Sequence, residues 1–450
     1  MTASDNLRIL LLSPRGPLYR HRGGIWKKSL RYQPLTLTTL AALIPPDIPA
    51  TVTLLDEGIH EIDPATPADL VGISVITGSA PRAYELADRF RGRGVPVVLG
   101  GVHPTLLPDE AAQHADSVVV GYAEDTWPQL LRDFVAGRLQ PRYTQAPDLS
   151  LANRPIARRD LLPQNQYVAP VTIEATRGCV HPCDFCVVPP AWGRRPYLRP
   201  VAEVVDEIRQ MRARRVLFLD LNLIADVNYA KELFAALIPL NITWGGLTTT
   251  LVAWDEELLD LLARSGCRGL LLGLETLSHD SLAETRKSFG LRRDYFEVVR
   301  QLHRRGIALM GCFAFGFDHD TPATFAATVQ FAIEANIDLP RFAILTPFPG
   351  TPLYHRLAAE GRILSRDWSL YDAQHVVFQP QQMTPAELQR GTEWAWKQTY
   401  SLRSIAKRLG RSRLSLPLAI PANLGYRFYA HRLHQYYHCD WMLDARRPGA

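Results

Sequence analysis

Three cysteines fall within ten positions of the chain, in the stretch RGCVHPCDFC (177–186). They are Cys179, Cys183 and Cys186, with the spacing Cys-x3-Cys-x2-Cys. Gly178 and Pro182 interrupt this stretch, so it is predicted to form a loop rather than one helix. Three thiolates on a short loop can ligate three irons of a [4Fe–4S] cluster and leave the fourth iron open to a small molecule. The alternatives are a zinc site completed by His181 or a distant residue, and three unrelated core cysteines.

Composition limits the class of protein around this motif. A chain of 450 residues is too long for one ordinary core, so two or three domains are expected. A hydrophobic content of 47% and a charged content of 21% are typical of a soluble globular enzyme. The net charge of +5 is too small to favour nucleic acid as a partner, but it suits an anionic cofactor or a small reductase.

Cysteine usage and apolar runs predict where the protein works. Six cysteines are too few for a disulfide scaffold, and the clustering of three indicates a reducing compartment. The chain does not open on a basic segment followed by a long apolar run, and no apolar run reaches 18 residues. We therefore expect a cytoplasmic protein that neither spans nor binds a membrane.

Short apolar runs alternate with helical patterns through residues 1–140. Strands are expected at 7–13, 50–56, 69–77, 96–104 and 117–124, and helices at 35–44 and 80–94. This alternation predicts an α/β domain with a doubly wound, Rossmann-like parallel sheet. Ligands bind such sheets beyond the carboxyl ends of the strands. The residues expected there include Ser74, Thr77, Gly100, Gly101 and His103.

Strand–helix alternation resumes after a polar, proline-bearing stretch at 141–168, which is predicted to be an extended linker. Six strand patterns follow, at 171–179, 215–224, 242–250, 267–276, 307–318 and 339–350. They predict a partial parallel barrel over 169–365, with the active site at the carboxyl ends of its strands. The cysteine motif directly follows the first of these strands. Residues 366–450 are predicted to form a mostly helical C-terminal domain.

The cysteine stretch resembles the radical S-adenosylmethionine (SAM) superfamily, whose signature is Cys-x3-Cys-x2-Cys with an aromatic residue just before the last cysteine, here Phe185. The resemblance implies a [4Fe–4S] cluster on the three cysteines, with SAM chelated at the open iron. One electron then cleaves the SAM sulfonium and releases a 5′-deoxyadenosyl radical, which abstracts hydrogen from a substrate. A barrel mouth closed by extra helices would keep water from this radical.

The same resemblance places SAM contacts on the barrel strands. Asp220 and Asn222 follow the second strand on alternate residues and are expected to face SAM. Glu275, at the tip of the fourth strand, is expected to bind a ribose hydroxyl. Gly311 and Phe315 belong to a segment, GCFAFGFD (311–318), that resembles the fifth-strand part packing beside adenine.

The sequence says less about the residues that contact the substrate than about those that contact SAM. The acid or base of the substrate step is unknown from the sequence. Asp318 and Asp320 are candidates for recognising a cationic amino sugar, or equally for a solvated loop with a helix N-cap.

The whole chain is similar to the class of radical SAM proteins with an N-terminal cobalamin-binding-type domain. Members that ligate cobalt through histidine carry Asp-x-His-x-x-Gly after the first strand, whereas His21 lies too late to match. This difference favours a scaffold domain without cobalamin, its pocket filled by side chains such as Trp26 and Tyr32. If a corrin binds, the Gly100–Gly101 turn is expected to let its nucleotide tail approach, within reach of Ser74 or Thr77.

We therefore expect a radical SAM enzyme that acts on a small polar natural product. Radical dehydration of an amino-sugar diol in antibiotic biosynthesis, a lyase-type reaction, is favoured, since the chain length resembles that of a diol dehydratase acting on an aminoglycoside. The first alternative is a cobalamin-dependent radical SAM C-methyltransferase. The second is a non-catalytic Fe–S or zinc module, which the complete set of barrel strands disfavours. The expected partners are the small-molecule substrate and an electron-donor reductase.

Overall fold

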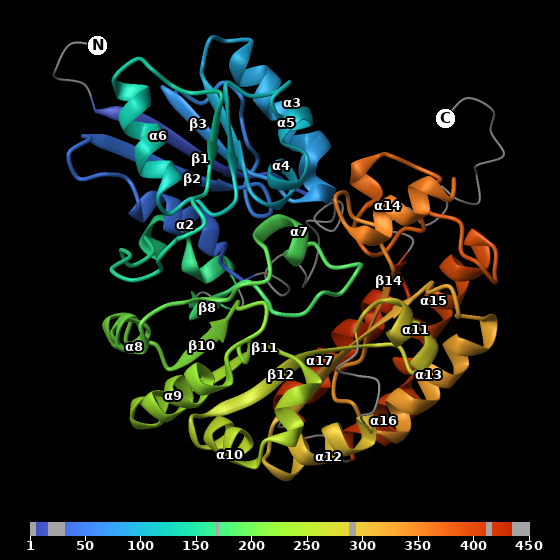
Figure 1. Ribbon diagram of the computed structural model, residues 1–450. Coiled ribbons are helices and arrows are strands. Elements are labelled where there is room, and N and C mark those ends of the chain that lie inside the picture. The colour runs from blue at the N-terminus through green and yellow to red at the C-terminus, as the bar shows by residue number, and fades with distance from the viewer. Residues whose placement is uncertain are drawn as a thin grey trace.

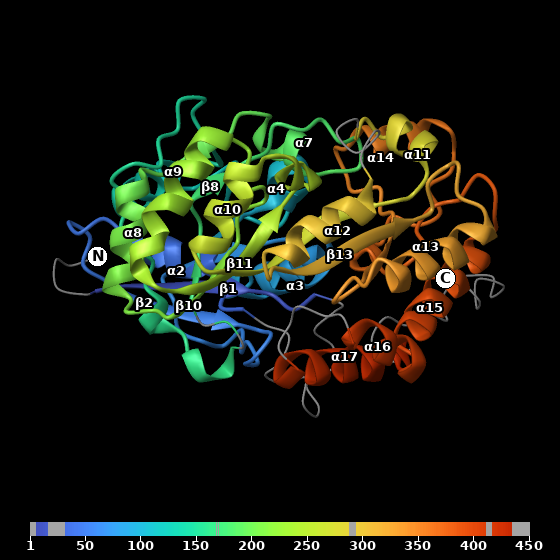
Figure 2. The ribbon, with the colours of Figure 1, turned by 90° about the horizontal axis from the view of Figure 1, so that it is seen from below.

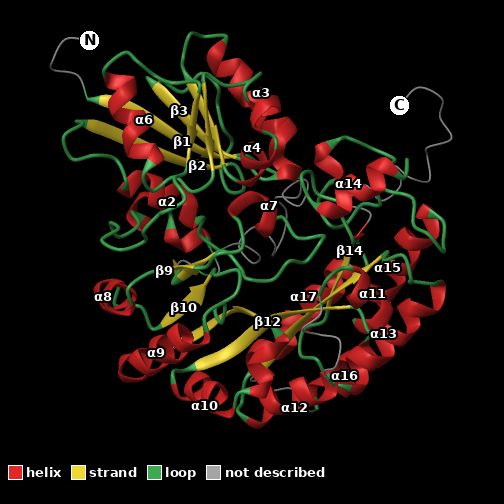
Figure 3. Cartoon of the chain, viewed as in Figure 1, coloured by secondary structure: helices red, strands yellow, loops and turns green. Residues whose placement is uncertain are grey.

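The computed structural model describes residues 6–16, 32–167, 169, 171–287, 294–410 and 416–433. An N-terminal sheet domain lies beside an open parallel barrel, and helices from the end of the chain flank the barrel (Figure 1, Figure 3). Within these residues, no helix is long and apolar enough to cross a membrane.

The first domain is a six-stranded parallel sheet in the order β2-β1-β3-β4-β5-β6. Its strands are β1 (Leu7–Ser13), β2 (Ala50–Asp56), β3 (Leu70–Ser74), β4 (Val97–Gly100), β5 (Ser117–Val120) and β6 (Arg142–Thr144). Its helices are α2 (Leu35–Ala42), α3 (Ala80–Arg91), α4 (Val102–Leu106), α5 (Pro108–Ala111) and α6 (Thr126–Val135). Alternate residues of β1 enter two separate cores: Leu10 packs with α3, and Leu11 with α2 and α6. Both faces are therefore covered, and the predicted doubly wound sheet is confirmed.

The region predicted as an extended linker belongs partly to this domain. β6 pairs with β5 at the sheet edge, and Tyr143, Leu162 and Tyr167 are buried in the core that contains α2 and α6. The 3-10 turns η3 (Arg159–Leu161) and η4 (Gln164–Gln166) lie in the same region. A three-residue edge strand with one buried side chain is too short for an alternation pattern to reveal.

The second sheet has six parallel strands in the order β14-β13-β12-β11-β10-β7. They are β7 (Thr172–Ile173), β10 (Arg215–Phe218), β11 (Thr243–Thr248), β12 (Cys267–Glu275), β13 (Ala308–Phe315) and β14 (Arg341–Ile344), each within a predicted segment. In the described part of the chain, β7 and β14 do not pair with each other, so the barrel is open. Its helices are α8 (Val201–Gln210), α9 (Val227–Leu237), α10 (Glu256–Arg264), α11 (His279–Glu284), α12 (Tyr295–Arg304), α13 (Pro322–Glu334) and α14 (Pro352–Ala359).

The two faces of the barrel strands differ in burial. Along β12 and β13, residues such as Leu272 and Phe313 are buried, while the intervening residues are half-buried. The half-buried face is the lumen side, and it carries Leu271, Gly273, Glu275, Met310, Cys312 and Ala314. A closed eight-stranded barrel fills its interior with side chains. Here the residues on the lumen side of β12 and β13 are not fully covered by protein.

The C-terminal helices cover the edge of the barrel sheet. α15 (Pro385–Thr399) packs along β14, followed by α16 (Leu402–Leu409) and α17 (Leu416–Ala430) (Figure 2). The Trp396 indole N–H donates to the Phe342 carbonyl at 3.1 Å, and the Tyr400 hydroxyl donates to the Pro340 carbonyl at 2.8 Å. These bonds shield an edge strand that would otherwise offer unpaired backbone groups.

Candidate active site

The three cysteines lie in a loop closed at its base by a short antiparallel ladder. β8 (Thr176–Arg177) pairs with β9 (Tyr197–Leu198), and α7 (Val188–Trp192) lies between them. We call residues 176–198 the cluster hairpin. Gly178 has a φ of +82°, and a Cβ there would lie 2.7 Å from the Arg195 carbonyl oxygen. The turn into the cysteine motif therefore requires glycine.

The cysteine side chains are half-buried free thiols. Burial raises the pKa of the Cys183 thiol to about 12 and that of Cys186 to about 11. Both are therefore neutral at pH 7 without a metal, and metal binding would release their protons.

The arrangement of these thiols distinguishes a cluster from a single ion. Among the residues that the structure describes, no three His, Cys, Asp or Glu side chains converge on one ion position. A zinc site needs such convergence, whereas a [4Fe–4S] cluster binds its thiolates at separate irons. The described residues thus give no support to a zinc site completed by His181. When bound, such a cluster supplies the single electron that cleaves SAM.

Asp220 and Asn222 follow β10 and lie buried under the cluster hairpin. Asn222 Nδ2 donates toward Cys179 Sγ at 3.8 Å. Burial raises the pKa of Asp220 to about 7, although hydrogen bonds from the backbone N–H groups of Ala175, at 3.1 Å, and Thr176 oppose this shift. These contacts give Asp220 a structural role, because they hold the first strand of the hairpin; its contact with SAM remains a prediction.

Glu275 lies on the lumen side at the end of β12, and its φ of +62° is unusual for a residue other than glycine. Lys287 Nζ donates to Glu275 Oε1 at 2.6 Å and to the Gly273 carbonyl at 2.8 Å. The charges of Glu275 and Lys287 both act on the Cys183 thiol, so the pair lies near the cysteines. A ligand held by those cysteines would have a carboxylate and an ammonium beside it. Sequence reasoning does not identify Lys287, because a lone lysine after a short helix belongs to no motif quoted for this family.

Gly311 and Phe315 do not face the lumen. A Cβ on Gly311 would lie 3.1 Å from the Ile337 side chain, and the Phe315 ring packs 4.8 Å from that of Phe325 on α13. These side-chain directions give no support to the predicted contact with SAM, which remains a prediction. Cys312 lies on the half-buried lumen face.

The carboxyl edge of the first-domain sheet meets the cluster hairpin, since α4 packs against α7 (Figure 1). Gly101, just before α4, has a φ of +107°, and a Cβ there would lie 2.7 Å from the Val75 carbonyl oxygen. This glycine is therefore required by the packing of its turn on the chain after β3. Close approach of a nucleotide tail is not needed to explain it.

Two other residues predicted at this edge are buried within the domain. Thr77 is buried, and His103 Nε2 lies 3.1 Å from the Tyr84 hydroxyl and 3.2 Å from Glu110. Tyr32 forms a parallel bridge with Ala169. His21 and Trp26 lie outside the described residues.

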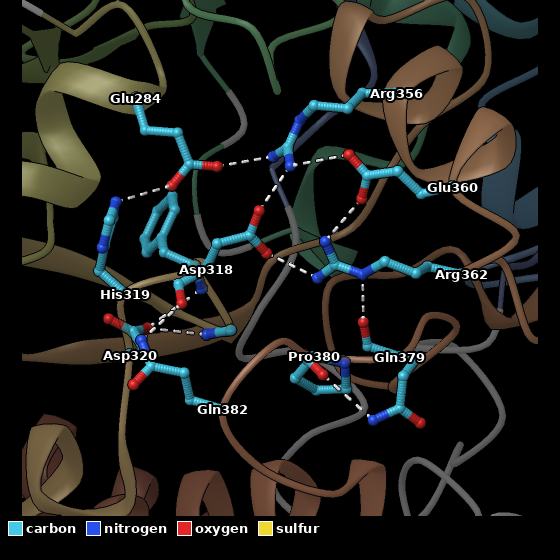
Figure 4. Close-up of polar contacts among 12 residues, drawn as sticks. Glu284, Asp318, His319, Asp320, Arg356, Glu360, Arg362, Gln379, Pro380 and Gln382 are labelled. Atoms are coloured by element: carbon cyan, nitrogen blue, oxygen red, sulfur yellow. Dashed lines mark hydrogen bonds and ion pairs between the residues drawn. The ribbon is translucent and has the colours of Figure 1, made fainter.

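A polar cleft of about 630 Å³ is lined by Glu284, Asp318, His319, Glu360, Arg362, Gln381 and Gln382. It adjoins the cluster hairpin, because Asp184 N–H donates to the Thr285 carbonyl at 3.1 Å. Arg362 donates to Asp318 at 2.6 Å, and Arg356 links Asp318 to Glu284 (Figure 4). Burial opposes ionisation of Asp318, but the arginine hydrogen bonds outweigh it and lower its pKa to about 2.

Neither aspartate predicted to recognise an amino sugar is available for that role. Asp318 is paired with two arginines, and Asp320 is buried and accepts the N–H groups of Gly316 and Phe317. The N-cap of α13 is Thr321 rather than an aspartate.

Comparison with known proteins identifies both domains. Residues 173–332 match the Radical SAM superfamily model, and residues 47–131 match the B12 binding domain model. Bacteriochlorophyllide d C-12(1)-methyltransferase of Chlorobaculum tepidum is 33% identical over 377 residues, covering 80% of this chain and 81% of that protein.

Two solved structures share the fold. The radical SAM methyltransferase TsrM from Kitasatospora setae, with cobalamin and a [4Fe–4S] cluster bound, has a TM-score of 0.63 at 20% identity and covers 79% of this chain and 75% of its own. The cobalamin-dependent SAM radical enzyme OxsB with aqua-cobalamin bound has a TM-score of 0.70 at 13% identity. The match covers 99% of this chain and 74% of that chain.

These matches agree with the cysteine geometry and the open lumen. The radical SAM domain implies a [4Fe–4S] cluster and SAM, and the B12-binding domain supports cobalamin as a further cofactor. The chain belongs to the radical SAM superfamily, in the group whose members also carry a B12-binding domain.

Proposed function

We propose that the protein is a cobalamin-dependent radical SAM methyltransferase that adds a methyl group to an unactivated carbon of a small molecule. The observation that carries this proposal is the packing of α4, at the carboxyl edge of the B12-binding domain, against α7 of the cluster hairpin. Cobalamin at that edge and SAM at the hairpin would belong to one interface. The relatives support the same reaction, because the bacteriochlorophyllide d enzyme and TsrM are both named methyltransferases.

This proposal replaces radical dehydration of an amino-sugar diol, which the matched relatives do not support. The preference for dehydration depended on chain length and on the missing cobalt-ligating histidine. The B12 binding domain model matches residues 47–131, and the relative from Chlorobaculum tepidum is named a methyltransferase; we give these matches more weight than the missing histidine.

Methylation of a carbon would consume two molecules of SAM and two electrons. One SAM gives up its methyl group and leaves as S-adenosylhomocysteine. The other yields methionine and, after taking the hydrogen atom from the substrate carbon, 5′-deoxyadenosine. Cobalamin, when bound, supplies the carrier for the methyl group. Both electrons come from outside the chain, so the proposal includes an electron-donor reductase as partner.

The lumen residues have defined parts in this proposal. The hairpin cysteines hold the cluster, and Asn222 donates toward the sulfur of Cys179. The Glu275–Lys287 pair orients SAM through one negative and one positive group. The lumen side also carries Leu247, Leu271, Met310 and Ala314, apolar side chains that help exclude water from a radical.

The test is product analysis after anaerobic reconstitution with iron, sulfide and hydroxocobalamin. With SAM and dithionite, we expect 5′-deoxyadenosine in all cluster-loaded samples and S-adenosylhomocysteine only in cobalamin-loaded ones. Bacteriochlorophyllide d is the first methyl acceptor to test, because the methyltransferase from Chlorobaculum tepidum is named for it. The triple cysteine-to-alanine variant is the control. Formation of 5′-deoxyadenosine with no S-adenosylhomocysteine under any cobalamin loading would contradict methyl transfer.

A further inference from the structure

One aromatic ring of the B12-binding domain touches the cluster hairpin at several points. Tyr122 follows β5, and the Arg177 guanidinium lies over its ring at 4.8 Å from the centroid. The Trp192 ring stacks on Tyr122 at 5.2 Å with an interplanar angle of 5°, and the Tyr197 ring meets it edge-on at 5.8 Å. Contacts of these kinds are individually modest, and three of them converge on this ring.

These partners define the base of the hairpin. Arg177 and Tyr197 are cross-strand neighbours in the β8–β9 ladder, and Trp192 ends α7, the helix after the last cysteine. Tyr122 therefore contacts the hairpin on both sides of the cysteine motif. Two further bonds support this arrangement: Glu124 pairs with Arg177, and the Gln145 amide donates to the Tyr197 hydroxyl at 3.1 Å.

Tyr122 is also tied to the sheet edge expected to hold cobalamin. The backbone N–H of its neighbour Gly121 donates to Thr105 Oγ1 at 3.0 Å. The Thr105 hydroxyl in turn donates to the Gly101 carbonyl at 2.8 Å, in the turn that begins α4. Two hydrogen bonds thus connect the β4–α4 turn to the segment that carries Tyr122.

We propose that Tyr122 is a positioning residue that fixes the cluster hairpin against the carboxyl edge of the B12-binding domain. This inference rests on the proposed function and extends it: the ring sets how SAM at the hairpin is presented to cobalamin at the sheet edge. Its loss uncouples the two uses of SAM, lowering methyl transfer while leaving reductive cleavage in place. The contacts are made by the ring, so phenylalanine preserves them.

The test compares Tyr122→Ala with the matched control Tyr122→Phe. In metal-free protein, hydrogen exchange of peptides spanning the cluster hairpin should be about tenfold faster in the alanine variant, the factor expected for losing a stack and a cation–π contact together. In protein reconstituted with iron, sulfide and hydroxocobalamin, SAM and dithionite are added without substrate. S-adenosylhomocysteine should form about tenfold more slowly in the alanine variant, with 5′-deoxyadenosine within about twofold of wild type. The phenylalanine variant should match wild type in both assays.

The experiment distinguishes failure of the positioning role from failure of the proposed function. Unchanged hairpin exchange in Tyr122→Ala, or faster exchange with an unchanged product ratio, overturns the positioning role. Failure of the wild-type holoenzyme to form any S-adenosylhomocysteine overturns the proposed function instead. If circular dichroism shows Tyr122→Ala to be unfolded, Trp192→Ala against Trp192→Phe removes the same stack from the hairpin side and gives the same readouts.

Discussion

Alanine at Gly178 should open the base of the cluster hairpin and prevent cluster loading. The φ of +82° at this position costs an alanine roughly 1–2 kcal/mol. The added Cβ would also lie 2.7 Å from the Arg195 carbonyl oxygen, a contact with backbone that cannot rotate away. Overpacking of this kind costs about 1–3 kcal/mol. The total is about 2–5 kcal/mol.

Gly193 provides the matched control within the same hairpin. Its φ is +75°, but a Cβ there meets nothing within 4 Å. Gly193→Ala should therefore carry a conformational cost without a backbone clash, because its ψ of −169° also favours glycine. At about 1.4 kcal/mol for each factor of ten, the clash should reduce the closed population by roughly 5- to 150-fold.

The assay is iron content and visible absorbance after anaerobic reconstitution, followed by SAM cleavage. Gly178→Ala should load little iron, whereas Gly193→Ala should load close to the wild-type amount. Equal iron loading in the two variants would show that the Gly178 turn does not close the hairpin as described.

Three further expectations concern the site. Replacing the three hairpin cysteines with alanine should abolish both the brown chromophore and 5′-deoxyadenosine formation; full iron loading in that variant would refute their role as ligands. Glu275→Gln should weaken SAM binding about tenfold by removing a charged partner, as measured by equilibrium dialysis, and an unchanged dissociation constant would move Glu275 to the substrate side. Hydrogen bonds from the arginines hold the pKa of Asp318 near 2, below the usual 3.8, so its stabilising contribution is complete above about pH 4 and is lost as the pH falls toward 2. Thermal melting from pH 2 to pH 5 should therefore show a smaller acid loss in Asp318→Asn than in wild type.

Most of the fold can be predicted from local patterns in the sequence. The strands of both sheets lie where apolar runs alternate with helical periodicity, and the cysteine spacing located the cluster loop because all three ligands are close in sequence. The sequence does not show which side chains of a strand point toward the lumen. In parallel sheets covered on both faces, the two sides of a strand have similar apolar character. Gly311 and Phe315 were therefore assigned to the lumen, although they pack against the helices.

The parts of the site that the sequence does not predict depend on contacts between residues far apart in the chain. Tyr122 and Arg177 meet only after two separate sheets have formed, so no spacing in the sequence connects them. Asp318 is an acidic residue just after a strand, a position that often contacts a ligand in such folds. The two arginines that pair with it come from α14 and from the segment that follows α14, so the sequence does not reveal this pairing.

The position of Tyr122 ahead of the cysteines has a consequence for biosynthesis. Domains generally fold from the N-terminus as the ribosome releases the chain. The sheet that carries Tyr122 is therefore synthesised before β8, β9 and the cysteines between them. The nascent hairpin emerges beside a surface that is already formed, which limits the time its thiols spend exposed to oxidation. A circular permutant that begins at the barrel and ends with the B12-binding domain would reverse this order, and its yield of cluster-loaded protein from cells should fall even though the finished fold is the same.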